Sequence, residues 1–369
     1  MVKIKLGDVI DFKNGKSVKK SDGIIPIYGG NGILGYTDKS NFSHTIVVGR
    51  VGAYCGSIHV EENSCWVSDN AIAGVPKEGQ DLTYLYYVLK SLNLNSKQIG
   101  SSQPLITQSM LKDMVVDIEI DIEKQKKIAN SISIIDQKIQ INNQINQELE
   151  AMAKTLYDYW FVQFDFPDQN GKPYKSSGGK LIYNPELKRE IPEGWGVKKV
   201  GELHIATGKR DANFGTENGQ YDFWTTANSP IKADEFSFEG KAILIAGNGN
   251  FYVNFTEGKF EAYQRTYVIQ SEDENMLIFM YMACLQSVEK LRKGSNGSII
   301  KYITIGDVNN IASPYNKKVV NEFVRIYSPL IDLISKNKRQ NQELTQLRDW
   351  LLPMLMNGQV YKRIEGKND

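Results

Sequence analysis

The chain contains Asn-Gln-Glu-Leu twice, at residues 146–149 and 341–344, each time inside a long segment that favours helix. The two copies lie 195 residues apart, and apolar residues around them recur at steps of four and three in both. This heptad pattern is typical of helices that pack along a shared seam. The seam positions are Ile128, Ile132, Ile135, Ile139, Asn142, Asn146, Leu149 and Leu156 in the first copy, and Phe323, Tyr327, Leu330, Ile334, Asn337, Asn341, Leu344 and Leu351 in the second.

Each copy places asparagine at the same two seam positions, Asn142 and Asn146 in one and Asn337 and Asn341 in the other. Two interpretations are open. The asparagines lie on a solvated face where the periodicity drifts, or they are buried and pair across the seam, which fixes register and helix direction at some cost in stability. The natural partner of each helix is the other one.

The duplication extends beyond the helices. At an offset of 194, Gly7-Asp8 matches Gly201-Glu202, Ile106 matches Ile300, and Asp113 matches Asp307, while the stretches between them diverge. We predict an α+β fold of two homologous modules in tandem, each followed by a long helix, with the two helices paired as an antiparallel coiled coil with pseudo-two-fold symmetry. The expected parts are a first module at 1–118, a helical region at 119–162, a linker at 163–194, a second module at 195–315 and a second helical region at 316–358.

Bulk features narrow the class of protein. The longest apolar run, residues 276–285, is too short to span a bilayer, and residues 1–10 lack the pattern of a secretory signal. Three cysteines without a Cys-x-x-Cys pair favour a reduced, cytoplasmic setting. Because the net charge is only +1, any binding of nucleic acid must rely on local patches.

Four phrases resemble one known family. They are "GSSQPLITQSMLKDMVVDIEIDIEKQKKIA" at 100–129, "LYDYWFVQFDFP" at 156–167, "IPEGW" at 191–195 and "LLPMLMNGQV" at 351–360. Their order and spacing are similar to those of the specificity subunit of type I restriction–modification systems, over nearly the whole chain. Two features depart from that pattern: the first module lacks the Pro-Glu-Gly-Trp entry, and the second has "GSNGSII" where the first has "GSSQPLI".

The resemblance implies a DNA-reading subunit without chemistry of its own. Each module would be a target recognition domain that reads one half of a split, asymmetric site in double-stranded DNA. The helices would space the modules and dock two modification subunits, which carry S-adenosylmethionine and methylate adenine; restriction subunits add cleavage. This chain itself would hold no cofactor and no metal. The alternative is a coiled-coil scaffold or partner-recognition protein with duplicated modules that does not bind DNA.

Motifs for independent chemistry are incomplete. The loop at 313–315 is one proline short of the Pro-Pro-Tyr/Phe phrase of an adenine methyltransferase, and the Gly-x-Gly at 247–249 is more typical of a turn. Pro167-Asp168 and Glu186-Leu187-Lys188 mimic a nuclease metal site but flank a Gly/Ser/Lys-rich segment that favours a loop. Zinc-ligand spacing is absent from the three histidines, His44, His59 and His204.

Candidate DNA contacts are Lys, Arg, Asn, Gln, Ser, Thr and Tyr residues that cluster in loops beside glycine or an aromatic ring. In the first module they are Lys13, Asn14, Lys16, Tyr28, Asn31, Arg50, Tyr54, Ser68, Asn70, Lys97, Ser101, Ser102 and Gln103. In the second they are Lys209, Arg210, Asn213, Thr225, Thr226, Asn228, Asn248, Asn250, Tyr263, Gln264, Arg265, Lys293, Ser295 and Asn296.

Arg50 and Arg265 are the favoured base readers, because a guanidinium can bind guanine through two hydrogen bonds. Arginine is scarce beside lysine in this chain, yet one falls near the middle of each module. An ion pair within the module is the competing role for either residue. The aromatic residues at 157–164 and the apolar run at 350–356 raise a similar choice between core packing and a partner surface.

Overall fold

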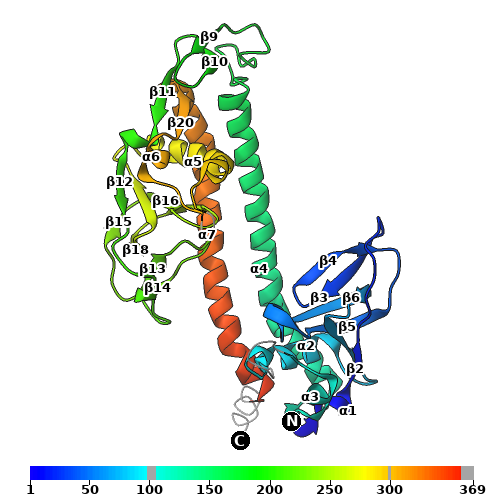
Figure 1. Ribbon diagram of the computed structural model, residues 1–369. Helices are drawn as coiled ribbons and strands as arrows, with labels where there is room; N and C mark the ends of the chain where they lie inside the picture. Colours follow the sequence, from blue (N-terminus) through cyan, green and yellow to red (C-terminus); the bar gives the residue numbers. More distant parts are fainter. Residues whose placement is uncertain (98–104, 298–300, 359–369) are drawn as a thin grey trace, which may run out of the picture. The chain divides into compact units, whose positions relative to one another are not determined.

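Figure 1 shows the protein as a computed structural model, which describes residues 1–97, 105–297 and 301–358. The chain divides into two compact units: the first comprises Met1–Asn142 and Arg339–Asp369, and the second comprises Asn143–Lys338. The two long helices, α4 (Ile122–Tyr157) and α7 (Lys317–Met356), each contribute to both units. Among the described residues, no helix has the length and apolarity that crossing a lipid bilayer requires.

A six-stranded sheet forms the body of the first unit. Its order is β2-β7-β5-β6-β3-β4, and all neighbours are antiparallel except β3 and β6. The strands are β2 (Ile10–Asn14), β3 (Ile25–Gly29), β4 (Gly32–Thr37), β5 (Phe42–Gly49), β6 (Ile58–Val67) and β7 (Ala71–Pro76). The short elements around it are β1 (Val2–Lys5), which pairs with β8 (Val115–Ile118), α1 (Leu6–Val9), η1 (Gly52–Tyr54), α2 (Leu82–Ser91), η2 (Leu94–Lys97) and α3 (Gln108–Asp113).

Helix α2 is joined to the start of α4 through polar contacts. The Asp81 side chain caps α2 by accepting a hydrogen bond from the Tyr84 N–H. The fully buried side chain of Gln125 on α4 accepts from the Asp81 N–H and donates to the carbonyl of Glu119. The phrase quoted above for residues 100–129 ends in Glu123-x-Gln125-x-x-Ile128 and the following Ala129, and this part has a structural reason: Gln125 bridges the module to the helix, and Ile128 enters the module's core.

The second unit contains two four-stranded sheets, ordered β12-β19-β16-β17 and β14-β13-β18-β15. Their strands are β12 (His204–Thr207), β13 (Tyr221–Trp224), β14 (Ile231–Ala233), β15 (Phe238–Glu239), β16 (Ala242–Ala246), β17 (Val253–Thr256), β18 (Lys259–Ala262) and β19 (Thr266–Gln270). The remaining elements are β11 (Gly196–Lys199), which pairs with β20 (Ala312–Tyr315), η4 (Val200–Glu202), η5 (Ala212–Phe214), α5 (Glu274–Gly294) and α6 (Ile305–Asn309).

Equivalent hydrogen bonds recur in the two units. The Leu6 N–H donates to the Met114 carbonyl, and the Val200 N–H donates to that of Ile311. The parallel pairing of β3 with β6 also has a counterpart, the parallel pairing of β13 with β18. In the second unit two strands, β17 and β18, stand in the place of the single strand β6, and a turn at Gly258 separates them.

The register of this repeat corrects two of the sequence matches. Gly7 lies against Lys112, and Gly201 lies against Asn309. A Cβ added at either glycine would be 3.1 Å from the Cβ atom and the carbonyl oxygen of that neighbour. The offset is thus 194 at the first glycine but 197 at its partner, so Ile106 corresponds to Ile303 and not to Ile300. Asp113 likewise corresponds to Asn310 and not to Asp307, since the divergent loops between these points differ in length.

Residues 163–194, expected to form a linker, are folded against the core of the second unit. They follow a π-helical turn at Asp158–Val162 and include the hairpin β9 (Leu181–Asn184) and β10 (Arg189–Pro192). Phe164, Phe166 and Ile191 are buried in the same apolar cluster as Trp195. The aromatic residues that end the first helix are therefore mostly core residues, although Tyr159 remains 37% exposed.

In the first unit, α4 and α7 contact each other in opposite chain directions. Asn142 donates its side-chain amide to Asn341 at 2.8 Å. Further along, Arg348 donates to Asp136 at 2.9 Å. Ile128 and Ile132 share an apolar cluster with Leu352 and Leu355. Residue numbers along these contacts therefore fall on α7 as they rise on α4, which means that the two helices are antiparallel here.

The second unit repeats this arrangement. Asn337 donates its side-chain amide to Asn146 at 2.9 Å, and the hydrogen bond is buried. Near the opposite end of this contact, the rings of Trp160 and Phe323 lie 6.0 Å apart. All sixteen predicted seam residues are buried or partly buried in their units, and the asparagines are paired, not solvated on an outer face.

Candidate nucleic-acid interface

The turn after β2 brings several candidate residues to one edge of the six-stranded sheet. The Gly15 N–H donates to the Ala71 carbonyl, and the Lys16 N–H donates to that of Val67. A Cβ at Gly15 would lie 2.0 Å from the Ser68 carbonyl oxygen, so only glycine fits this close approach of two backbones. The Lys16 side chain is exposed next to this crossing.

Arg50 lies at the same edge, directly after β5. Its N–H donates to the Asn70 carbonyl at 2.9 Å, and its own carbonyl accepts from the Ile106 N–H at 3.0 Å. Within the described ranges its side chain has no ion pair, and its buried Nε atom lacks a hydrogen-bond partner. The edge therefore gathers five predicted contacts: Asn14, Lys16, Arg50, Ser68 and Asn70.

The second unit builds the same edge with different side chains. The Gly208 N–H donates to the Thr266 carbonyl, and a Cβ at Gly208 would lie 2.2 Å from the Ala262 carbonyl oxygen. Gly247 donates to the Arg265 carbonyl and accepts from the Ile303 N–H, as Arg50 does with Asn70 and Ile106. Arg265 therefore occupies the position of Asn70. The arginine of this unit directly precedes β19, whereas Arg50 of the first unit directly follows β5.

A hollow of about 330 Å³ opens at this second edge. Arg265 is exposed in its wall and, in the part of the chain that the structure describes, makes no ion pair. The Tyr267 hydroxyl donates to the Ile303 carbonyl at 3.0 Å, and burial raises the pKa of Tyr267, so the ring stays neutral. The other lining residues are Thr207, Gly247 and Gln264.

Thr207 and Tyr267 were not among the predicted contacts. Thr207 could have been found from the sequence, because Asn14-Gly15-Lys16 and Thr207-Gly208-Lys209 share the Gly-Lys pair. No comparable repeat marks Tyr267, whose counterpart by strand pairing is Ile72.

Three predicted contacts already have partners within their module. Tyr28 is only 8% exposed, and its hydroxyl donates to Glu61 at 3.1 Å; burial, with the Glu61 charge, raises its pKa. Arg210 bonds Glu235 and the fully buried Glu261, which makes it a structural residue of the second unit. Lys13 pairs with Asp11 at 3.0 Å, although both side chains remain about half exposed. Tyr28 and Arg210 are therefore removed from the candidate set, while Lys13 is kept.

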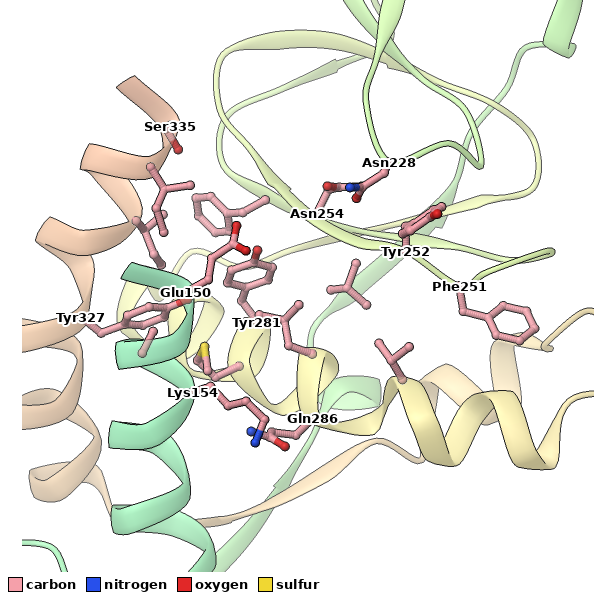
Figure 2. Close-up of a pocket in the computed structure, with 18 of the residues that line it drawn as sticks. Glu150, Lys154, Asn228, Phe251, Tyr252, Asn254, Tyr281, Gln286, Tyr327 and Ser335 are labelled. Atoms are coloured by element: carbon pink, nitrogen blue, oxygen red, sulfur yellow. The ribbon is translucent and has the colours of Figure 1, made fainter. Parts of the chain in front are cut away.

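The remaining candidates are dispersed or lie elsewhere. Thr225 and Thr226 are partly buried, and the Thr225 carbonyl accepts from the Thr266 hydroxyl. Asn228 and Asn250 line a cavity bounded by the long helices (Figure 2). Ser101, Ser102 and Gln103 lie outside the described residues, and Lys97 ends η2 at their border. The others are exposed or partly exposed. Tyr54 lies in η1, Asn213 in η5 and Lys293 near the end of α5, whereas the rest lie outside the named helices and strands: Asn31, Asn248, Tyr263, Ser295 and Asn296.

The carboxylates that resemble a nuclease site are engaged separately. Asp168 accepts backbone hydrogen bonds from Asn170 and Lys172 in its own turn, whereas Glu186 pairs with Lys199 at 2.6 Å. No group of three or more His, Cys, Asp or Glu side chains within residues 1–97, 105–297 and 301–358 could hold a metal ion.

A comparison with known families decides the assignment. The family model described as "Type I restriction modification DNA specificity domain" matches residues 1–151 and 192–346. This chain belongs to that family. The resemblance drawn from the four sequence phrases is therefore confirmed. Specificity subunits of these systems are the non-catalytic components, and catalytic activity lies in separate subunits.

Individual relatives agree with the family. The type I restriction enzyme MjaIX specificity subunit of Methanocaldococcus jannaschii is 28% identical over 319 residues, which cover 78% of this chain and 71% of that protein. The EcoDI specificity subunit of Escherichia coli is 33% identical over 192 residues, covering 49% of this chain and 42% of that one. A type I restriction–modification S subunit structure from M. genitalium superposes with a TM-score of 0.64 at 18% identity, covering 96% of this chain and 95% of that one. The mixed α+β fold class is thus confirmed.

Proposed function

We propose that this chain is the DNA-recognition subunit of a type I restriction–modification enzyme and reads a bipartite, asymmetric site through two homologous modules. The observation that carries the proposal is the pair of equivalent sheet edges, each with a Gly-Lys turn and an arginine that has no ion-pair partner among the described residues. Equivalent backbone frames with different side chains suit two readers of two different half-sites.

Charge supports direct contact with DNA at these edges. Lys16 and Lys209 are exposed at the two turns and would bind phosphates, which position a protein on the duplex. Arg50 and Arg265 would then reach base edges in the groove. An arginine without an internal carboxylate partner keeps guanidinium donors available for this purpose, although the Nε atom of Arg50 is itself buried.

The helices would space the two modules. Under this proposal α4 and α7 form one antiparallel pair with pseudo-two-fold symmetry, in which Asn142 pairs with Asn341 and Asn146 pairs with Asn337. Asn142 thereby contacts the counterpart of Asn146, and Asn146 contacts the counterpart of Asn142, as an isologous interface requires. Buried asparagines of this kind fix register and direction, so the spacing of the modules would be fixed as well.

The chemistry would come from partners. We propose that two modification subunits dock on the chain, bind S-adenosylmethionine and methylate adenine, and that restriction subunits join where the system has them. The test is to incubate the chain with the methyltransferase subunit of its own organism, randomised duplex DNA and labelled S-adenosylmethionine. Methylation of defined adenines only when both proteins are present supports the proposal. Methyl transfer by the chain alone, or a complex that ignores DNA, would indicate an enzyme or a scaffold instead.

A further inference from the structure

A cavity of about 390 Å³ lies in the second unit between α4, α5, α7 and the strand β17 (Figure 2). This volume falls in the range of roughly 300–1,000 Å³ that is usual for sites of small molecules. Aromatic and aliphatic side chains make up most of its wall, and Tyr281 and Tyr327 face it from α5 and α7. No step of DNA recognition proposed above uses this cavity.

The cavity exists because two helix positions differ between the units. At the helix offset of 195 residues, Ala153 corresponds to Arg348 and Ile331 corresponds to Asp136. In the first unit Arg348 and Asp136 are bonded at 2.9 Å, and Tyr87 donates to the same carboxylate at 2.9 Å, so long polar side chains fill the space. In the second unit alanine and isoleucine line an open volume instead.

Two polar side chains in the wall have no hydrogen-bond partner among the described residues. Asn254 is 7% exposed and Tyr327 is 2% exposed, yet neither side chain makes a hydrogen bond to another described residue. Burial raises the pKa of Tyr281 and Tyr327, so both hydroxyls remain neutral. The polar atoms of both side chains keep some access to the cavity, so a ligand or water there can bond them.

The charged side chains of the wall limit the ligand further. Lys154 bonds Asp158 at 2.5 Å, and Arg292 bonds Glu289, so neither cation is available for a phosphate. The Glu150 carboxylate lies by Tyr281 and Tyr327 (Figure 2), and its contact with Lys338 is long, at 3.8 Å. Glu150 offsets the charge of Lys338, the third cation of the wall, and as a carboxylate it keeps further acceptor sites for ligand hydroxyls.

We propose that this cavity binds a purine nucleoside. The ring of Tyr281 would contact a face of the base, and the Asn254 amide would pair with a purine edge that offers both a donor and an acceptor. Glu150 would accept from the ribose hydroxyls, as an acidic residue does in many nucleotide sites. Since the nearby cations are engaged, a nucleoside fits better than a nucleotide.

The test uses the full chain with adenosine and adenosine monophosphate as probes, measured by isothermal titration calorimetry. The double variant A153R/I331D introduces the Arg–Asp pair of the first unit and fills the cavity; it is expected to weaken adenosine binding at least tenfold. The matched control, Met152→Arg, adds the same side chain at an adjacent position that is 59% exposed and should leave binding unchanged. Asn254→Ala removes the amide without adding bulk and should weaken adenosine at least fivefold.

Saturable binding of adenosine to the native chain that is lost in A153R/I331D supports the proposal. Equal binding by the filled and native chains, or no binding of adenosine at millimolar concentration, would overturn it. Tighter binding of the monophosphate than of adenosine would overturn the nucleoside class. If A153R/I331D does not fold, as judged by circular dichroism, Asn254→Ala decides, and unchanged adenosine binding there contradicts the proposal. Sequence-specific DNA binding is a separate readout, so the proposed function stands or fails independently.

Discussion

Asn337 donates its side-chain amide to Asn146 at 2.9 Å in a buried contact between the two long helices. The two residues are not counterparts at the repeat offset, because Asn146 corresponds to Asn341 and Asn337 to Asn142. The crossed pairing is what two copies of one helix make when they meet antiparallel about a two-fold axis. The repeated asparagines of the sequence therefore form a hydrogen-bonded pair between the two helices.

Asn146→Leu is expected to destabilise the protein. It leaves the amide of Asn337, which is 7% exposed, without its partner, and this costs roughly 1–3 kcal/mol. Asn146→Leu/Asn337→Leu should recover most of the loss, because two apolar side chains replace both partners. Urea unfolding monitored by circular dichroism measures the effect, with Asn130→Leu on the exposed face of α4 as control. A single variant as stable as the native chain would contradict the buried pairing.

The Asp136–Arg348 contact predicts a dependence of stability on pH. Burial alone would raise the pKa of Asp136, but the hydrogen bond from Arg348, the charge of Lys90 and the hydrogen bond from Tyr87 together lower it. A carboxyl whose pKa is lower in the folded state stabilises the fold above its unfolded pKa of about 4. This contribution is lost as the pH falls through the lower folded value.

Arg348→Ala should therefore lower the free energy of unfolding at pH 7 by roughly 1–3 kcal/mol and reduce the further loss on acidification. Urea unfolding at a series of pH values from neutral to acid measures both effects. Asp349→Ala is the control, since it removes only the exposed partner of Arg348 and should cost less than about 1 kcal/mol. An unchanged pH dependence in Arg348→Ala would show that Asp136 does not depend on this contact.

Arg265→Ala is expected to weaken specific DNA binding by roughly 1–3 kcal/mol and to relax preference at one base pair. Arg50→Ala should do the same at a different base pair. Fluorescence anisotropy of the complex with its methyltransferase partner, on matched and singly altered duplexes, gives both values. Arg325→Ala, an exposed arginine on α7, is the control. Equal weakening on all duplexes would mean that the arginine contacts only phosphate.

Lys16→Ala and Lys209→Ala should weaken binding on all sequences alike. Each removes one proposed phosphate contact, so the slope of log K against log salt should fall in magnitude by about 1 per substitution. Titrations at several salt concentrations measure this slope. A change in base preference without a change in slope would assign these lysines to base reading instead.

The sequence predicted the two long helices because heptad spacing is a local pattern. It left open whether the seam asparagines are solvated or buried in pairs, and the hydrogen bonds of Asn142 and Asn146 to the other helix show the pairing. Phrases such as Gly15-Lys16 predicted loops but not their meeting with Ser68, which depends on strand pairing between β2 and β7. The burial of Tyr28 and the ion pairs of Arg210 were missed for the same reason: their partners Glu61 and Glu261 are distant in sequence.

The most direct test of a split reader is selection of bound sites from a randomised duplex library by the complex of this chain with its methyltransferase subunits. We expect an enriched site of two specific blocks separated by a stretch without preference, with Arg50→Ala altering one block and Arg265→Ala the other. A single uninterrupted block, or both substitutions altering the same block, would contradict two modules that each read one half of the DNA site.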